Sequence, residues 1–241
     1  RMWFASIWIF TLNLPWQLGS DFFYRNLLDA DAASNTLSWR WVAGLHTPGK
    51  FYLARQDNIE KFSNFSFKNK SQLKEKISAP THESFAYEKP NFLNVINDQI
   101  KFYLISPNNL IYKKEIIDML NKSQVIYLES HKNKLDSKTK INFEKSALNH
   151  YLRWLENNGI NLIKISSEND LKKLVSERLN IIYTHYPCVG YEKDRINKMC
   201  SEFNLDIKYL HDSFDLECWP HAKSGFFKFK NNIDKFLRNM N

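Results

Sequence analysis

The stretch LDADAASNTLSWRW, residues 28–41, is the most informative part of this chain. Its two aspartates suit the start of a helix, because a side-chain oxygen there accepts a hydrogen bond from a free backbone N–H group. Residues 32–42 contain neither Gly nor Pro, and Gly44 is a suitable C-terminal stop. The stretch therefore predicts a helix over Ala32–Val42.

Asp31, Asn35 and Trp39 are spaced four residues apart and so share one face of that helix. A carboxylate, an amide and an indole on one stripe are unusual for plain core packing and suggest a binding surface. The alternative is structural: a capped helix with a buried Trp and an Asn that caps the helix or faces solvent. The spacing alone leaves both interpretations open.

The residues on either side of this stretch are rich in aromatic side chains, and five of the seven Trp fall within the first 41 residues. Arg1–Leu14 is nearly all apolar, which predicts a buried helix. Pro15–Leu28 predicts a second helix with Pro15 at its first position, and Phe51–Phe62 a loop or short helix. Residues 1–62 are thus predicted to form a helical block.

Three further segments of different composition follow the helical block. Residues 63–98 are Lys-rich and interrupted by Pro, as in a linker. Residues 99–216 alternate five predicted strands with four predicted helices, which indicates a five-stranded parallel α/β (Rossmann-like) domain. Residues 217–241 predict a loop and a short basic helix. The fold class is therefore α + α/β: an all-helical block followed by a parallel-sheet domain.

Composition narrows the function classes. With 241 residues, 43% hydrophobic and 25% charged, the chain is globular in composition, and its net charge of +8 suits an anionic partner such as nucleic acid. Three Cys without C-x-x-C spacing exclude a disulfide framework, predict no metal site and fit a cytoplasmic protein. The longest apolar stretch, Met2–Leu14, is too short to span a bilayer, so no membrane partner is expected. No standard dinucleotide or P-loop motif follows the first predicted strand.

The order and spacing of several motifs resemble the C-terminal part of the FAD-binding domain of DNA photolyases and cryptochromes. The matching elements are Arg1-Met2-x-x-Ala5-Ser6, Trp16-x-x-Gly19 and Leu28-Asp-Ala-Asp31-x-Ala-x-Asn35-x-x-x-Trp39-Arg-Trp41. Arg55-Gln-Asp-Asn58 resembles the family's Arg-x-x-Asn-Pro element, with Ile59 in place of Pro. Because the chain starts at Arg1, we expect a fragment whose upstream helices, and with them part of the flavin site, are missing.

The resemblance implies FAD as the cofactor and assigns four residues to it. Asn35 would place its amide opposite flavin N5 and tune the reduced state. Asp29 and Asp31 would line the polar edge of the isoalloxazine ring, and Arg1 would lie against that edge and pair with an Asp.

The resemblance also implies a path for electrons and a place for the substrate. Trp39 would be the proximal and Trp16 the middle member of the family's tryptophan chain, so Trp39, Trp16 and Asn35 are the candidate catalytic residues. Met2 and Trp41 would border the cavity for a flipped-out lesion, where a flat aromatic wall suits an unstacked base. Arg55 is the third residue assigned to the substrate, damaged DNA.

The α/β half resembles, more weakly, the antenna domain of photolyases. That domain normally precedes the FAD-binding domain, whereas here it follows, in swapped order. The sequence leaves open whether an antenna chromophore binds.

Three functions are compatible with these residues. The first is a light-driven lyase that splits pyrimidine dimers in DNA by electron transfer from reduced flavin. The second is a cryptochrome-like blue-light photoreceptor without repair activity, which needs the same residues. The third is a module that keeps the fold but neither activity. The first is the prediction that we adopt, while lesion type and oligomeric state stay open.

Overall fold

The computed structural model describes residues 1–47, 49–64, 73–77, 99–128, 135–176, 180–223 and 225–239. Most of the predicted linker, residues 63–98, lies outside these ranges. The chain divides into two compact units. A helical unit comprises Arg1–Phe85 with Lys132–Phe143, and a sheet unit comprises Ala86–His131 with Glu144–Asn241.

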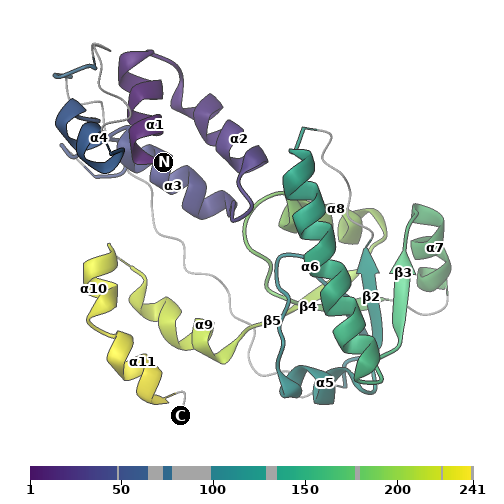
Figure 1. Cartoon of the computed structure of the whole chain (residues 1–241). Coiled ribbons are helices and arrows are strands. Elements are labelled where there is room, and N and C mark those ends of the chain that lie inside the picture. The colour runs from purple at the N-terminus through teal and green to yellow at the C-terminus, as the bar shows by residue number, and fades with distance from the viewer. Residues whose placement is uncertain are drawn as a thin grey trace. The chain divides into compact units, whose positions relative to one another are not determined.

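The helical unit is built from short helices (Figure 1). They are α1 (Met2–Ser6), the π-helix η1 (Ile7–Thr11), α2 (Trp16–Asn26), α3 (Ala32–Val42) and α4 (Gln56–Phe62). The predicted bounds of α3 are confirmed. The single helix predicted over Arg1–Leu14 is wrong, because α1 passes into the wider π-turn and ends at Thr11. Pro15 is the cap residue before α2 rather than its first helical residue.

Both ends of α3 are fixed by the residues that predicted them. The Asp31 carboxylate accepts a hydrogen bond from the backbone N–H of Ser34 at 2.8 Å. At the other end Gly44 has a φ of +80°, a conformation that only Gly adopts without cost. The backbone N–H of Leu45 then reaches the carbonyl of Arg40 at 2.9 Å, which closes a Schellman turn.

The prediction that the N-terminal helix is buried is wrong. In α1 and η1 only Ala5 and Ser6 are buried, while Met2 is 43% and Phe4 41% exposed. A small group of helices can enclose only one face of an apolar helix, and here that face is the one that meets Trp39 of α3. The described unit therefore carries an apolar outer surface.

Residues 135–143 were predicted to be part of the α/β domain but pack on α2 of the helical unit. Lys140 is 3% exposed, and its Nζ donates to the carbonyl of Tyr24 at 2.8 Å. The same ammonium lies 3.3 Å from the carboxylate of Asp136 and 4.1 Å from the centre of the Tyr24 ring. A buried charge must be paired in this way, because desolvating it alone is costly.

The sheet unit contains the predicted five-stranded parallel sheet. Its strands are β1 (Phe102–Ile105), β2 (Gln124–Leu128), β3 (Leu162–Ile165), β4 (Ile181–His185) and β5 (Asp206–Leu210). The order across the sheet is β3-β2-β1-β4-β5, and every pairing is parallel. The helices between them are α5 (Lys114–Leu120), α6 (Lys138–Asn157), α7 (Glu168–Ser176) and α8 (Tyr191–Glu202). These are the four helices that the sequence predicts between the strands.

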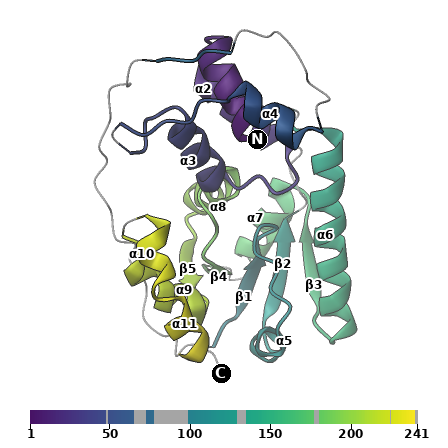
Figure 2. The same cartoon turned by 60° about the vertical axis from the view of Figure 1, so that its left-hand side comes forward.

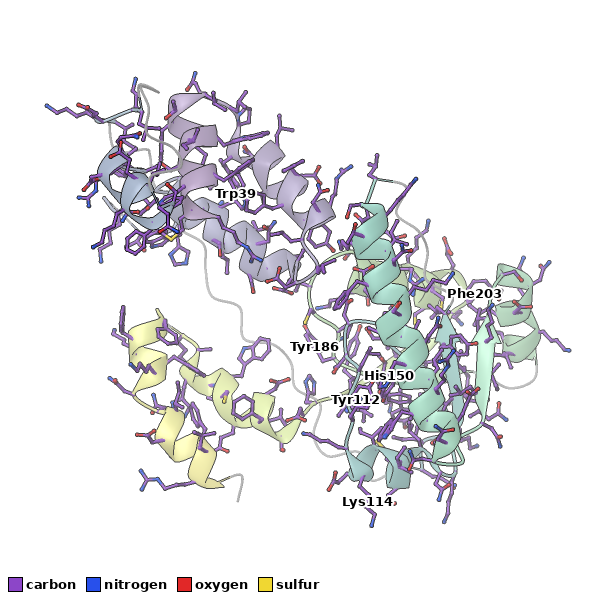
Figure 3. The ribbon with its side chains drawn as sticks, viewed as in Figure 1. Trp39, Tyr112, Lys114, His150, Tyr186 and Phe203 are labelled. Carbon is purple, nitrogen blue, oxygen red and sulfur yellow. The ribbon has the colours of Figure 1, made fainter. Side chains whose placement is uncertain are left out.

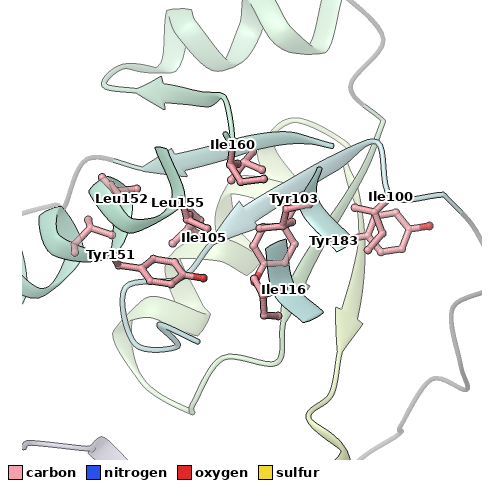
Figure 4. Packing of buried hydrophobic residues seen from close by; sticks show 12 residues of the cluster. Ile100, Tyr103, Ile105, Ile116, Tyr151, Leu152, Leu155, Ile160 and Tyr183 are labelled. Atoms are coloured by element: carbon pink, nitrogen blue, oxygen red, sulfur yellow. The ribbon is translucent and has the colours of Figure 1, made fainter. Parts of the chain in front are cut away.

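The two faces of the sheet are read directly from the alternation along β1. Tyr103 and Ile105 point to the face covered by α5 and α6, whose cluster Figure 4 shows, with Tyr151 and Leu155 of α6 among its members. The cluster on the opposite face contains Phe102 and Leu104 together with residues of α7 and α8. Successive strand residues face opposite sides of the sheet, and all four residues of β1 are apolar and buried. Both faces of this strand are therefore covered, as is usual in a parallel sheet. Figure 2 shows the helices on either side of the strands.

The chain after β5 continues as short helices rather than the predicted loop and one helix. They are α9 (Ser213–Cys218), the 3-10 turn η2 (Trp219–His221), α10 (Phe226–Lys230) and α11 (Ile233–Asn239). Phe236 is 1% exposed and packs its ring against His221 and Phe229. Among the described residues, none of the helices is both long enough and apolar enough to cross a membrane.

One polar pair lies inside the sheet unit. The Tyr103 hydroxyl and Nδ1 of His185 are 2.6 Å apart, and both side chains are buried. Burial lowers the pKa of His185 to about 4, because the charged imidazolium would lose its hydration.

This shift predicts an acid-sensitive sheet unit. As pH falls from about 6.5 toward 4, the unfolded chain takes up the His185 proton first, so the free energy of unfolding should drop by about 3 kcal/mol. Urea unfolding at a series of pH values measures this loss. His185→Gln, which keeps a polar group opposite Tyr103 but does not titrate, should flatten the curve in this window. An equal loss of unfolding free energy in the wild type and in His185→Gln would contradict the assignment of this acid sensitivity to His185.

Candidate functional site

The helical unit contains a pocket of about 450 Å³ beside α3. Most residues that the resemblance assigns to cofactor and substrate line it: Arg1, Met2, Asp29, Asp31, Asn35, Trp39 and Trp41. The other lining residues are largely apolar and come from α1, α2, α3 and the turn between α2 and α3, among them Phe23, Leu27 and Leu37. The structure thus collects residues that lie up to forty positions apart in the sequence.

The rim of the pocket is polar. Arg1 donates from one guanidinium nitrogen to both carboxylate oxygens of Asp29, at 2.8 and 2.9 Å. This hydrogen bond lowers the pKa of Asp29. Both side chains are more than half exposed, so the pair adds little stability. Its effect is local: it neutralises one of the two aspartates and leaves Asp31 as the rim carboxylate without a basic partner among the described residues.

Asn35 is held in one orientation. Its Nδ2 donates to the backbone carbonyl of Ser20 at 2.8 Å and approaches the Ser20 hydroxyl oxygen at 3.0 Å. A carbonyl oxygen can only accept a hydrogen bond, so the amide nitrogen must face α2. The amide oxygen Oδ1 then has no hydrogen-bond partner among the described residues. The hydrogen bonds to Ser20 thus hold the amide of Asn35, one of the residues that line the pocket, in one orientation.

Trp39 forms the inner wall and is the centre of the unit's small core. It is 2% exposed and lies among α1, α2 and α3 (Figure 3). Gly19 of α2 faces its six-membered ring so closely that a Cβ on Gly19 would overlap Cη2 and Cζ3. Only Gly lets the two helices approach to this distance.

Trp41 and Met2 complete the aromatic and apolar side. The Trp41 ring stacks on Tyr52 with centroids 6.3 Å apart. The segment that carries Tyr52 is fixed to α1, because the backbone N–H of Ala54 donates to the buried Ser6 hydroxyl at 2.8 Å. The pocket thus has a flat apolar wall and a polar rim, which suits a planar ring system with one polar edge.

Two predicted site residues lie elsewhere. Trp16 lines a separate pocket of about 300 Å³ on the α2 side and has the guanidinium of Arg40 5.8 Å from its ring centre. Arg55 is the cap residue before α4 and pairs with Asp57 at 3.4 Å on the surface. Neither residue lines the 450 Å³ pocket, but Trp16 shares its own pocket with Asn35 and packs against the cluster that contains Trp39.

Sequence reasoning missed Ser20 entirely. Ser20 is 15 residues from Asn35, and no helical spacing relates the two positions, because a turn lies between α2 and α3. The only available signal was its place next to Gly19 in the motif that begins at Trp16. Once Gly19 is set against Trp39, the next residue of α2 falls beside Asn35.

Comparisons with known proteins give matches in the segment that forms this pocket. Residues 1–71 match the family model described as the FAD binding domain of DNA photolyase. A deoxyribodipyrimidine photo-lyase of Agrobacterium fabrum is 48% identical over 44 residues, which cover 18% of this chain and 9% of that protein. Cryptochrome-1 of Arabidopsis thaliana is 34% identical over 67 residues, covering 28% of this chain and 10% of that protein. No solved structure gives a significant match.

The resemblance to the photolyase and cryptochrome family is therefore confirmed, over residues 1–71. The chain spans about a tenth of the length of these curated relatives. The pocket residues fit the isoalloxazine part of FAD, since the open Asn35 oxygen and the aromatic wall match a ring with one polar edge. The cation among the residues that line this pocket is Arg1, and it is paired with Asp29.

The contact between Gly19 and Trp39 leads to a stability prediction. Gly19→Ala should lower the free energy of unfolding by about 1–3 kcal/mol, because the added methyl group forces the Trp39 ring to move. Unfolding followed by Trp fluorescence measures this loss. Gly225→Ala is the matched control, since no atom lies within 4 Å of a Cβ there.

The ring overlap can be separated from a general effect of Ala in α2. In a Trp39→Phe background the smaller ring leaves space, so Gly19→Ala should cost less than in the wild type. Equal costs in the two backgrounds would mean that the Gly19–Trp39 contact is not what requires Gly.

Proposed function

We propose that the protein takes part in FAD-dependent, blue-light-driven DNA repair of the deoxyribodipyrimidine photolyase type. The observation that carries the proposal is the pocket that brings Asn35, Trp39 and Trp41 together in the segment related to photolyase FAD-binding domains. Bound FAD would supply the light absorption and the one-electron chemistry that splits a pyrimidine dimer. The chain's own residues would hold the flavin ring, donate an electron to reduce it and bind the lesion.

Each residue has a task that follows from its position. Asn35 offers its fixed Oδ1 to an N–H on the cofactor ring, which favours a protonated, reduced ring. Asp31 and the Arg1–Asp29 pair set the charge along the polar edge. Trp39 is the nearest buried indole of the pocket wall and is the candidate electron donor to the cofactor.

The proposed lesion contacts lie on the open side of the pocket. Met2 is 43% exposed, and Trp41 is supported from behind by Tyr52. A base turned out of the duplex would stack on such a rigid indole. The net charge of +8 favours approach to DNA at low ionic strength. Arg55, exposed beside α4, would contact phosphate rather than the lesion itself.

A cryptochrome-like photoreceptor is the second candidate. The match to Cryptochrome-1 of Arabidopsis thaliana supports it as far as the photo-lyase match supports repair. Both functions need the same pocket, so the two differ in what happens after light absorption. Repair is preferred because the exposed Met2 and the half-buried Trp41 give the pocket an apolar and aromatic side that suits an unstacked base.

We further propose that the sheet unit corresponds to the antenna domain, placed after the FAD-binding segment. Its strand order supports this, since doubly wound nucleotide-binding sheets place their first five strands in the order 3-2-1-4-5. A pocket of about 470 Å³ lies at the ends of β2 and β3 beside α8 and has both apolar and charged walls. An absorption band beyond those of flavin in the purified protein would test this pocket for a bound pigment.

The role of Asn35 is tested by FAD titration of the full chain, followed by flavin fluorescence. Asn35→Ala should weaken binding about five- to tenfold, because one hydrogen bond to the ring is lost. Ser38→Ala is the control: Ser38 also lines the pocket, but its hydroxyl donates to the carbonyl of Ser34 at 2.6 Å. Equal FAD affinities of Asn35→Ala and Ser38→Ala would show that Asn35 does not bind the flavin ring.

The repair activity is tested with an oligonucleotide that contains one pyrimidine dimer. The full chain, loaded with chemically reduced FAD, should restore the intact pyrimidines under blue light and not in the dark. Trp41→Ala should lower lesion binding more strongly than it lowers FAD binding, because Trp39 still forms the inner wall. Flavin that bleaches in light while the dimers stay intact would favour the photoreceptor, and a folded chain without flavin affinity would leave only the fold.

A further inference from the structure

The last two helices of the chain, α10 and α11, carry an exposed basic and aromatic surface (Figure 1, yellow). Residues 222–238 contain one acidic side chain, Asp234, and five basic ones: Lys223, Lys228, Lys230, Lys235 and Arg238. This segment therefore has a net charge of +4, which is half of the +8 of the whole chain. The acidic residues before it end at Glu217 in α9. A surface of this charge attracts a polyanion.

Most of these cations are available to a ligand. Four exposed lysines form no ion pair with another described residue: Lys223, Lys228, Lys230 and Lys235. By contrast, Lys113 is held 2.7 Å from the carboxylate of Asp212. An unpaired ammonium group can replace the counterions of a phosphate backbone, and the release of those ions favours binding. The charge of α10 and α11 therefore suits a partner that carries phosphates.

Phe227 of α10 is the most exposed large apolar side chain that the structure describes, with 80% of its surface open. Successive residues of a helix lie about 100° apart around its axis. The half-buried Phe229 packs on the buried Phe236 and so marks the inner face of α10. Phe227 then points away from that face, with Lys228 on one side and Lys230 on the other. The outer face of α10 is thus an aromatic ring between two ammonium groups.

A second exposed ring shows what is special about Phe227. Phe62 of α4 is 66% exposed, but Nζ of its neighbour Lys61 lies 5.3 Å from the ring centre and covers one face. No cation lies over the Phe227 ring among the described residues. The adjacent ring of Phe226 meets it at 64° with centroids 5.8 Å apart, so the two rings are not stacked. Phe227 therefore keeps a ring face for a ligand.

The turn between α10 and α11 holds this outer face in place. The backbone N–H of Asn232 donates to the carbonyl of Phe229 at 2.9 Å, and its side-chain Nδ2 donates to the carbonyl of Lys228 at 3.2 Å. The backbone N–H of Phe236 in turn donates to the carbonyl of Asn232 at 3.1 Å. Because the backbone that carries the ring is already fixed, less conformational entropy is lost when a ligand stacks on Phe227.

We propose that the outer face of α10 binds single-stranded nucleic acid. One base stacks on Phe227, and Lys228 and Lys230 contact the phosphates on either side of it. A single strand fits better than a duplex, because its bases expose the ring faces that a duplex hides. A lipid surface fits less well, since it requires a continuous apolar face and here lysines flank the ring.

This surface is distinct from the proposed lesion site. None of the residues of α10 or α11 lines the pocket of about 450 Å³ that contains Asn35 and Trp39. The inference therefore goes beyond the proposed repair function and needs neither flavin nor light. It assigns the chain a contact with unpaired nucleotides that is independent of any lesion.

The stacking contact is tested by fluorescence anisotropy of a labelled oligothymidylate, with the full chain in the dark and without FAD. Phe227→Ala should weaken binding about tenfold, because the stacked base loses its partner. Phe227→Tyr keeps an aromatic ring and should keep the affinity. Phe62→Ala is the matched control, since it removes another exposed ring beside a lysine, and it should leave binding unchanged. Equal affinities of the wild type and Phe227→Ala overturn the proposal and leave the flavin function standing.

The phosphate contacts are tested by the salt dependence of the same binding. In the double variant Lys228→Gln with Lys230→Gln, the slope of log affinity against log salt should become shallower by about 1.4, since each phosphate contact of a single strand contributes about 0.7. Lys145→Gln with Lys172→Gln removes the same charge from exposed positions of α6 and α7 and is the control. An equal change of slope in both double variants means that only the overall charge matters, which overturns the site.

A third comparison separates nucleic acid from a lipid surface. Phe227→Leu keeps an apolar side chain but cannot stack, so it should lose oligothymidylate binding as Phe227→Ala does. In Phe227→Trp, the added indole emission should be quenched by oligothymidylate, because a base lies against the ring. A blue shift of that emission with vesicles of phosphatidylserine and phosphatidylcholine, bound equally well by Phe227→Leu, overturns the proposal in favour of a membrane surface.

Discussion

The close contact between α2 and α3 at Gly19 and Trp39 is the constraint on which the helical unit depends. Because Gly19 has no Cβ, the Trp39 ring fits against the α2 backbone. The core of this unit is small, with Ala5, Trp39 and Val42 as its buried centre, so one large ring supplies much of the apolar burial. The same approach brings Ser20 beside Asn35 and so fixes the amide that faces the pocket.

The polar and the apolar side chains of the pocket are held in place by different contacts. The polar groups lie on the turn before α3 and on its first helical residues, where Asp31 is already held by its capping hydrogen bond. The apolar wall comes from Trp39 and Trp41, one buried in the core and the other stacked on Tyr52. A side chain that already makes a hydrogen bond or packing contact within the protein has few alternative rotamers. It therefore loses little conformational entropy when a ligand binds.

The sheet unit follows a simpler rule. Strand residues alternate between two apolar faces, and five parallel strands with helices on both sides satisfy nearly all of the pattern. Among the polar side chains buried in this unit are Tyr103 and His185, whose hydrogen bond keeps the two groups compatible with an apolar interior. Its low histidine pKa is the consequence of that burial.

The sequence by itself determined the helices and strands that have strong local signals. It predicted α3 with both ends, the five parallel strands and the family resemblance of residues 1–62, because caps, glycine stops, alternation and motif spacing are local in the chain. Only the tertiary structure decided that α1 runs into a π-turn, that Ser20 orients Asn35 and that the Trp8 ring meets Trp39 edge to face. These depend on which surfaces meet when helices pack, and packing between distant residues leaves no period in the sequence.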